Sequence, residues 1–108
     1  MTLREMQKEA WAISESKGFH KDHQHPAIRL MLVVSELSEA VEELRKGHDA
    51  TKIYEKDGKP EGFPIEIADA VIRLGDLCEC AGMDLETAVR MKLGFNKTRP
   101  MMHGGRKF

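Results

Sequence analysis

The sequence predicts an all-α domain of about four helices. Two observations carry this prediction. Apolar residues recur at helical spacing along most of the 108 residues, and helix start and stop signals bracket each periodic segment. The length suits one domain, residues 1–108, and leaves no room for a second. A domain of this size buries a thin core, so assembly with further copies is a common supplement.

Each predicted helix has a start signal. Thr2 followed by Glu5 is a capping-box signature. Pro26 and Pro64 suit the first turn of a helix, and Asp84 suits an N-cap. Glycines stop the first three helices, at Gly18, Gly47 and Gly82. The predicted helices span about residues 2–17, 26–46, 64–82 and 84–96.

The segments between the helices are polar. Residues 18–25, GFHKDHQH, predict a loop, and the last twelve residues, KTRPMMHGGRKF, predict an irregular basic tail. Residues 48–63 form a long polar connection, in which Asp57-Gly58 suits the turn of a small hairpin. A connection of this length is unusual in a compact helical domain and is often functional.

Charge and composition exclude some classes of function. With 17 basic and 18 acidic residues the formal net charge is −1, which gives no general attraction to nucleic acid or to an anionic membrane. No apolar run approaches the ~18 residues that span a bilayer, and the charged N-terminus does not resemble a signal peptide. Two cysteines, Cys78 and Cys80, cannot form a secreted disulfide framework. We therefore expect a cytoplasmic protein.

One acidic phrase occurs twice, as ELSEAV at 36–41 and as EIADAV at 66–71. Because each helical residue advances by about 100°, the two acids of each phrase lie about 60° apart on their helix. Both pairs border an apolar stripe on the same side. The stripe residues are Val33, Leu37, Ala40, Val41 and Leu44 on the second helix, and Ile67, Ala70, Val71, Leu74, Leu77 and Cys78 on the third.

If the two stripes pack together, Glu36, Glu39, Glu66 and Asp69 converge. Carboxylates gathered in a partly buried place repel one another, and a hard cation such as Mg²⁺ or Mn²⁺ relieves the repulsion. The residues alone leave open whether these acids hold a metal or form an ordinary solvated helix surface.

Other constellations are weaker. No Glu is followed three residues later by His, so a ferritin-like di-iron site is not indicated. The loop at 18–25 has metal-ligating side chains but no second ligand set, which favours a solvated loop. These side chains are His20, Asp22, His23 and His25. Cys78 lies on the apolar stripe and suits the core. Trp11 suits either a core anchor or a platform for a nucleobase. No Walker A or GxGxxG motif is present.

The segments SELSEAVEELRKG, KPEGFPIEIADAVIRLGDL, MDLETAVRMKLGFNKTRP and HGGRKF resemble the MazG-like all-α nucleotide pyrophosphohydrolases. This superfamily also includes dCTP pyrophosphatases and dimeric dUTPases. Its signature, ExxE followed after a spacer by ExxD, is matched by Glu36/Glu39 and Glu66/Asp69, with 26 residues between. The resemblance covers roughly residues 26–108. The sequence departs from the family at Ser35 and Ser38, and the aromatic residues that hold the base in some relatives are not clearly matched.

The resemblance implies a four-helix MazG-like bundle and an Mg²⁺-dependent nucleoside triphosphate pyrophosphohydrolase. Such an enzyme cleaves between the α and β phosphates and releases a nucleoside monophosphate and pyrophosphate. The four acids would bind the metal and act in catalysis, with Mn²⁺ as a substitute. The residues expected to bind substrate are Lys92, Asn96, Arg99 and, as a candidate, Trp11.

Assembly and an alternative function complete the expectations. Apolar residues of PAIRLMLVV, at 26–34, point in nearly all directions around their helix. This pattern and the resemblance both predict a homodimer or a dimer of dimers. The resemblance also implies a nucleoside triphosphate substrate, and the near-neutral net charge argues against nucleic acid or a membrane as a partner. The alternative is a non-catalytic helical interaction or regulatory module, which would dock through the basic tail.

Overall fold

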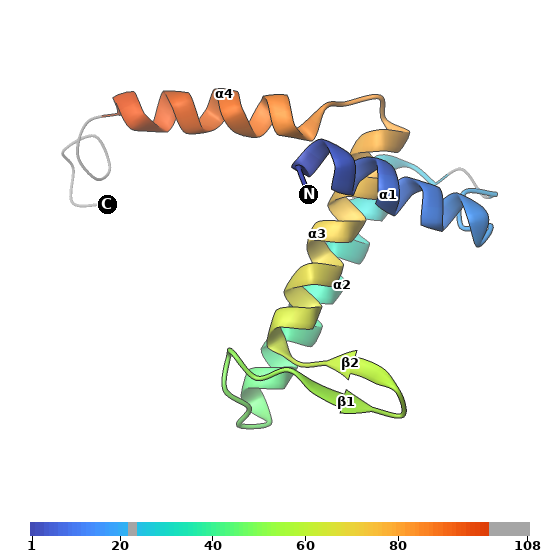
Figure 1. Ribbon diagram of the computed structural model, residues 1–108, viewed down its shortest axis with the longest axis vertical. Helices are drawn as coiled ribbons and strands as arrows, with labels where there is room; N and C mark the ends of the chain where they lie inside the picture. Colours follow the sequence, from blue (N-terminus) through green and yellow to red (C-terminus); the bar gives the residue numbers. More distant parts are fainter. Residues whose placement is uncertain (22–23, 100–108) are drawn as a thin grey trace.

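The structure, a computed structural model, describes residues 1–21 and 24–99 and is mostly helical (Figure 1). The helical class predicted from the sequence is confirmed. The elements are α1 (Leu3–Ser16), α2 (Pro26–Arg45), β1 (Tyr54–Lys56), β2 (Lys59–Glu61), α3 (Phe63–Cys80) and α4 (Leu85–Thr98). Most of the predicted basic tail, residues 100–108, lies outside the described residues.

The helices do not form a closed bundle within one chain. α2 and α3 lie side by side as the central pair, and α1 crosses the end of α3 that leads to α4 (Figure 1). α4 extends away from the pair and has no buried residue. Its apolar side chains Met91, Leu93 and Phe95 are all more than half exposed. The MazG-like bundle therefore stays a prediction.

The predicted start signals act as expected. The Thr2 hydroxyl accepts a hydrogen bond from the Glu5 backbone N–H at 3.0 Å, and the Glu5 carboxylate accepts one from the Thr2 backbone N–H at 3.0 Å. The Asp84 carboxylate accepts from the Thr87 backbone N–H and so caps α4. These short-range bonds satisfy N–H groups that a helix start leaves without partners.

The predicted hairpin is present and determines where α3 begins. Asp57 and Gly58 have φ values of 53° and 80°, as a two-residue turn of type I′ requires. β2 is followed by Gly62, whose φ is 124° and whose Cβ, if it had one, would overlap the Lys52 carbonyl oxygen. A glycine is needed here, and it places Glu66 in the first turn of α3.

The core is small and consists mostly of short side chains. Its buried apolar residues are Ala10, Val33, Ala40, Ala70, Leu77 and Cys78. Gly75 allows α1 to approach α3 closely, since a Cβ there would lie 3.3 Å from the Gln7 Cα. Much of the two predicted stripes stays exposed, for example Leu37 and Val41 on α2. A single chain thus leaves part of its apolar surface uncovered.

Gln7 is the one fully buried large side chain among the described residues. Its amide nitrogen donates to Glu79 Oε1 at 2.9 Å and to the Met83 carbonyl at 2.6 Å. Its amide oxygen accepts from the Leu85 N–H at 3.1 Å. Gln7 therefore connects α1 to the end of α3 and to the start of α4.

Across residues 1–21 and 24–99, no helix is both long and apolar enough to cross a bilayer.

Candidate functional site

Three acids of the repeated phrase meet between α2 and α3. Glu36 comes from the middle of α2, and Glu66 and Asp69 come from the first two turns of α3. Each offers a carboxylate oxygen, and these oxygens lie within 4.8 Å of one another. All three residues are half-buried. We call Glu36, Glu66 and Asp69 the carboxylate cluster.

Glu39, the fourth predicted acid, is exposed and does not belong to this cluster. It follows Glu36 by three residues, so it lies about 60° further round α2. This rotation is enough to place it on the solvent side of the helix. Its role as a ligand stays a prediction.

Partial burial and mutual repulsion make the charged forms of the carboxylate cluster unfavourable. Partial burial, the charge of Asp69 and a hydrogen bond with Glu36 raise the pKa of Glu66 from 4.5 to about 7. Burial and the charge of Glu36 also raise the pKa of Asp69. Arg73 offsets part of this, because its Nε lies 2.9 Å from Glu36 Oε1. A cation among these oxygens would relieve the remaining repulsion.

A second acidic group adjoins the first and shares Glu66. Oxygens of Glu43, Glu61 and Glu66 also lie within 4.8 Å of one another. Glu43 is 4% exposed and accepts hydrogen bonds from the Tyr54 hydroxyl at 3.0 Å and from His48 Nδ1 at 2.7 Å. These bonds, led by the one from His48, lower the pKa of Glu43.

Sequence reasoning did not assign Glu43 a role. A signal existed, since Glu43 falls between Glu36 and Glu39 around the axis of α2. Its partners could not be found from that pattern, because Tyr54 and Glu61 belong to the two strands of the hairpin. Glu43 holds the hairpin beside the carboxylate cluster through the Tyr54 hydroxyl, and a functional role for the long connection stays a prediction.

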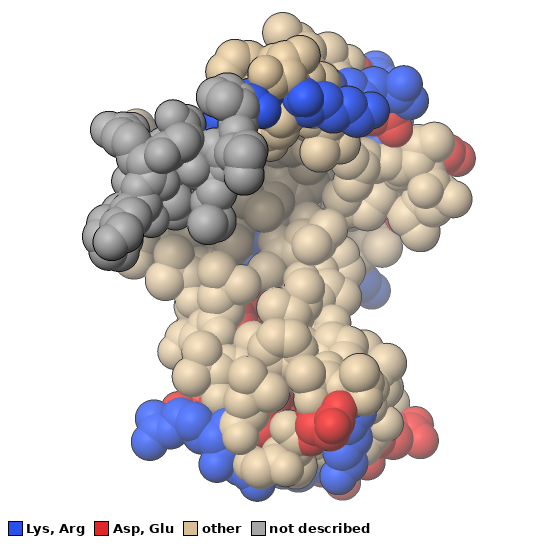
Figure 2. Space-filling model, turned by 90° about the vertical axis from the view of Figure 1, so that its left-hand side faces the viewer, with Lys and Arg blue, Asp and Glu red and all other residues tan. Residues whose placement is uncertain are grey.

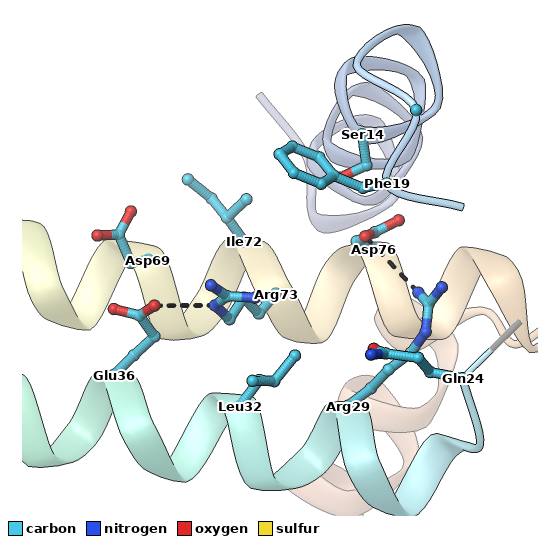
Figure 3. A pocket seen from close by; sticks show the side chains of 11 residues that line it. Ser14, Phe19, Gln24, Arg29, Leu32, Glu36, Asp69, Ile72, Arg73 and Asp76 are labelled. Atoms are coloured by element: carbon cyan, nitrogen blue, oxygen red, sulfur yellow. Dashed lines mark hydrogen bonds and ion pairs between the residues drawn. The ribbon is translucent and has the colours of Figure 1, made fainter. Parts of the chain in front are cut away.

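A cavity of about 600 Å³ opens beside the carboxylate cluster. Glu36 and Asp69 lie together at one end, and Arg29 and Asp76 form an ion pair at the other (Figure 3). Phe19 reaches over it from the segment after α1. The cavity therefore combines acids, arginines and an aromatic ring within the volume of a drug-sized ligand site.

The other predicted substrate-binding residues lie elsewhere in the chain. Trp11 stacks on His20, with ring centroids 5.4 Å apart, and borders a second cavity of about 590 Å³. Lys92 and Arg99 lie over the Phe95 ring of α4, and Asn96 is exposed on the same helix. None of the three α4 residues lines either cavity. Their assignment as substrate ligands stays a prediction.

The donor chemistry of the carboxylate cluster fits Mg²⁺ or Mn²⁺. Its donors are carboxylate oxygens, without sulfur or imidazole, and hard divalent cations prefer such ligands. Three carboxylates can hold one such ion while leaving positions for water or phosphate oxygens.

Metal-free stability should fall as pH rises from about 4.5 to 7, because Glu66 binds its proton more tightly in the folded state than in the unfolded state. His20, whose pKa is also raised, adds to this trend near the upper end. Glu66→Gln should therefore reduce the dependence of the free energy of unfolding on pH without abolishing it. Urea unfolding in a chelator, repeated across this pH range, measures both slopes. Identical slopes for parent and variant would contradict the assigned pKa of Glu66.

The sequence matches no family model, and no curated protein or solved structure is significantly similar to it.

Proposed function

We propose that the protein is an Mg²⁺-dependent nucleoside triphosphate pyrophosphohydrolase that cleaves (d)NTP between the α and β phosphates. The observation that carries the proposal is the carboxylate cluster at one end of a cavity of about 600 Å³. A metal-binding end beside a partly apolar space suits a ligand with a charged phosphate chain and a flat base. The resemblance in sequence to MazG-like enzymes points to the same chemistry.

Each part of the cavity has a task in this reaction. Glu36, Glu66 and Asp69 would hold Mg²⁺, which neutralises the negative charge of the triphosphate. Arg73, 44% exposed at the rim, can donate hydrogen bonds to phosphate oxygens while it orients Glu36. A carboxylate of the cluster accepts the proton of the attacking water. Phe19 offers a ring against which a base can stack.

The products identify the reaction. Incubation with a panel of nucleotides and Mg²⁺, followed by phosphorus NMR, should show pyrophosphate and a nucleoside monophosphate as the first products. Orthophosphate as the initial product would exclude α–β cleavage. No turnover of any nucleotide would favour the alternative, a non-catalytic interaction module, for which the exposed apolar surface of α4 is the supporting observation.

We further propose that the protein works as a homodimer or a dimer of dimers. α2 exposes apolar side chains on several sides, and α4 buries none of its own. The space-filling view shows a mostly uncharged face between the basic side chains at the α4 end and the mixed charges at the hairpin end (Figure 2). In such an assembly the α4 of a second copy can bring Lys92, Asn96 and Arg99 toward the cavity.

Sedimentation at micromolar concentration should give a mass at least twice the 12.2 kDa of the chain. Val34→Glu, on the exposed side of α2, should shift the protein toward monomer, because the new charge would be buried in the interface. Ile53→Glu is the matched control, since Ile53 is also at least half exposed but lies outside α2 and α4. A parent protein that sediments as a monomer would contradict the proposal.

A further inference from the structure

A second group of metal-ligating side chains lies about two helical turns along α3 from the carboxylate cluster. It combines His20, from the segment between α1 and α2, with Asp76 and Cys80 of α3. One ligand atom from each residue lies within 4.8 Å of the other two. In the sequence, the loop at 18–25 had metal-ligating side chains but no second set of ligands. The fold supplies that second set, because it brings Asp76 and Cys80 next to His20.

The geometry of α3 presents two of these ligands together. Asp76 and Cys80 are four residues apart, so their side chains share one face of the helix. Asp76 Oδ1 lies 3.8 Å from Cys80 Sγ and 2.8 Å from His20 Nε2. Tetrahedral zinc sites place neighbouring N, O and S ligands about 3.3–3.6 Å apart, so the His20–Asp76 pair must open by about 0.5 Å.

His20 is held in the orientation that a metal ligand needs. Its Nδ1 lies 2.6 Å from Glu15 Oε2, and its ring stacks on Trp11. The Glu15 carboxylate keeps a proton on Nδ1. Without a metal, Nε2 donates to Asp76 Oδ1 at 2.8 Å, and an ion that displaces this proton would meet the Nε2 lone pair beside Asp76 and Cys80, as in carboxylate–histidine–zinc sites. The His20 side chain is only 11% exposed, so this orientation is largely fixed.

The charges of the group also match a divalent ion. Arg29 Nη1 lies 3.3 Å from Cys80 Sγ and 3.7 Å from Asp76 Oδ2, and Figure 3 shows the pair with Asp76. With Cys80 as thiolate and His20 neutral, the group carries a net charge of −2. This counts the carboxylates of Glu15 and Asp76, the Cys80 thiolate and the Arg29 guanidinium. One M²⁺ neutralises this charge, and the displaced thiol and imidazole protons pass to solvent.

We propose that His20, Asp76 and Cys80 bind a divalent transition-metal ion of the zinc type, with Glu15 orienting His20. The mixed N, O and S donors suit Zn²⁺ or Co²⁺ and distinguish this site from the all-oxygen carboxylate cluster. The cavity of about 590 Å³ that borders His20 and Cys80 leaves room for water as a fourth ligand. The bound ion fixes the segment between α1 and α2 against α3. This site does not depend on the proposed hydrolysis.

Co²⁺ is the probe for this site. The reduced, oxygen-free protein is titrated with Co²⁺ in excess Mg²⁺, so that the carboxylate cluster is occupied by Mg²⁺. We expect one Co²⁺ per chain, with a thiolate-to-cobalt charge-transfer band in the near ultraviolet and tetrahedral d–d bands in the visible. Zn²⁺ should displace both. Absence of the charge-transfer band at millimolar Co²⁺ would overturn the proposal.

The two cysteines provide a matched pair of variants. Cys80→Ser should remove the charge-transfer band, whereas Cys78→Ala should keep it, because Cys78 is buried and lies outside the group. Glu15→Gln should weaken Co²⁺ binding about 10–100-fold while the band persists at saturation. Asp69→Asn should leave the titration unchanged. A band that survives Cys80→Ser, or that Cys78→Ala removes from a folded protein, would refute the assignment.

Discussion

Asp69→Asn should abolish hydrolysis while leaving the metal-free protein at least as stable as the parent. The substitution keeps the shape of the side chain and removes one of three charges within 4.8 Å of one another. Because those charges repel, metal-free unfolding should need as much urea or more. Activity should fall by about 100-fold or more, because the bound cation contributes several kcal/mol to transition-state stabilisation and each 1.36 kcal/mol is a factor of ten.

Metal-induced stabilisation gives an independent readout of the same change. Millimolar Mg²⁺ or Mn²⁺ should raise the melting temperature of the parent by an amount that grows with the logarithm of its affinity for the folded state, so the upshift should shrink in Asp69→Asn. Glu55→Gln, at an exposed position of β1, is the control and should alter neither activity nor upshift. Full activity together with a full upshift in Asp69→Asn would mean that the second acidic phrase is ordinary helix surface.

Local signals predicted most of the secondary structure. The Thr2 capping box, the Asp84 cap and the Asp57-Gly58 turn act within two to four residues, so the sequence displays both partners of each interaction. Gly62 shows where this reasoning stops. It was expected only as part of a polar loop, but its positive φ and its contact with Lys52 determine where α3 starts.

The site was predictable to the extent that it repeats a pattern along a helix. Glu36, Glu66 and Asp69 were identified from that repeat, and the packing of α2 against α3 brings them together. The pattern could not separate Glu39 from Glu43, because only about 40° of rotation around α2 separates the exposed side chain from the buried one. It also could not place α4, whose exposed apolar residues have no covering element within the described chain.

The transition-metal group was beyond sequence reasoning for a different reason. His20 lies 56 positions before Asp76, and nothing in the loop sequence indicates which helix it meets. The grouping of Glu15, Asp76 and Arg29 around His20 and Cys80 can be recognised only in the folded chain. Mixed-donor sites drawn from a loop and a helix are therefore found by geometry, whereas repeated carboxylates on helices are found by periodicity.

Gln7→Ala should be among the most destabilising single changes in α1. Gln7 is 0% exposed and satisfies three groups, at Glu79, Met83 and Leu85. Removing it takes away three hydrogen bonds to part-buried groups, at about 0.5–1.5 kcal/mol each, and opens a cavity beside Gly75. We expect a loss of about 3 kcal/mol in the free energy of unfolding. For a domain of this size that lowers the melting temperature by more than about 10 °C.

Gln7→Leu separates the effect of the lost hydrogen bonds from the effect of the cavity, because leucine restores most of the volume but none of the hydrogen bonds. It should recover part of the loss and remain well below the parent, since the Leu85 N–H and the Met83 carbonyl still lack their partner. Glu9→Ala, at an exposed position of α1, should change stability by less than about 0.5 kcal/mol. Because Gln7 also fixes the chain between α3 and α4, both Gln7 variants should weaken self-association if α4 lies in the interface. Parent-like stability in Gln7→Leu would show that filling this space, and not hydrogen bonding, is what the α1–α3 contact requires.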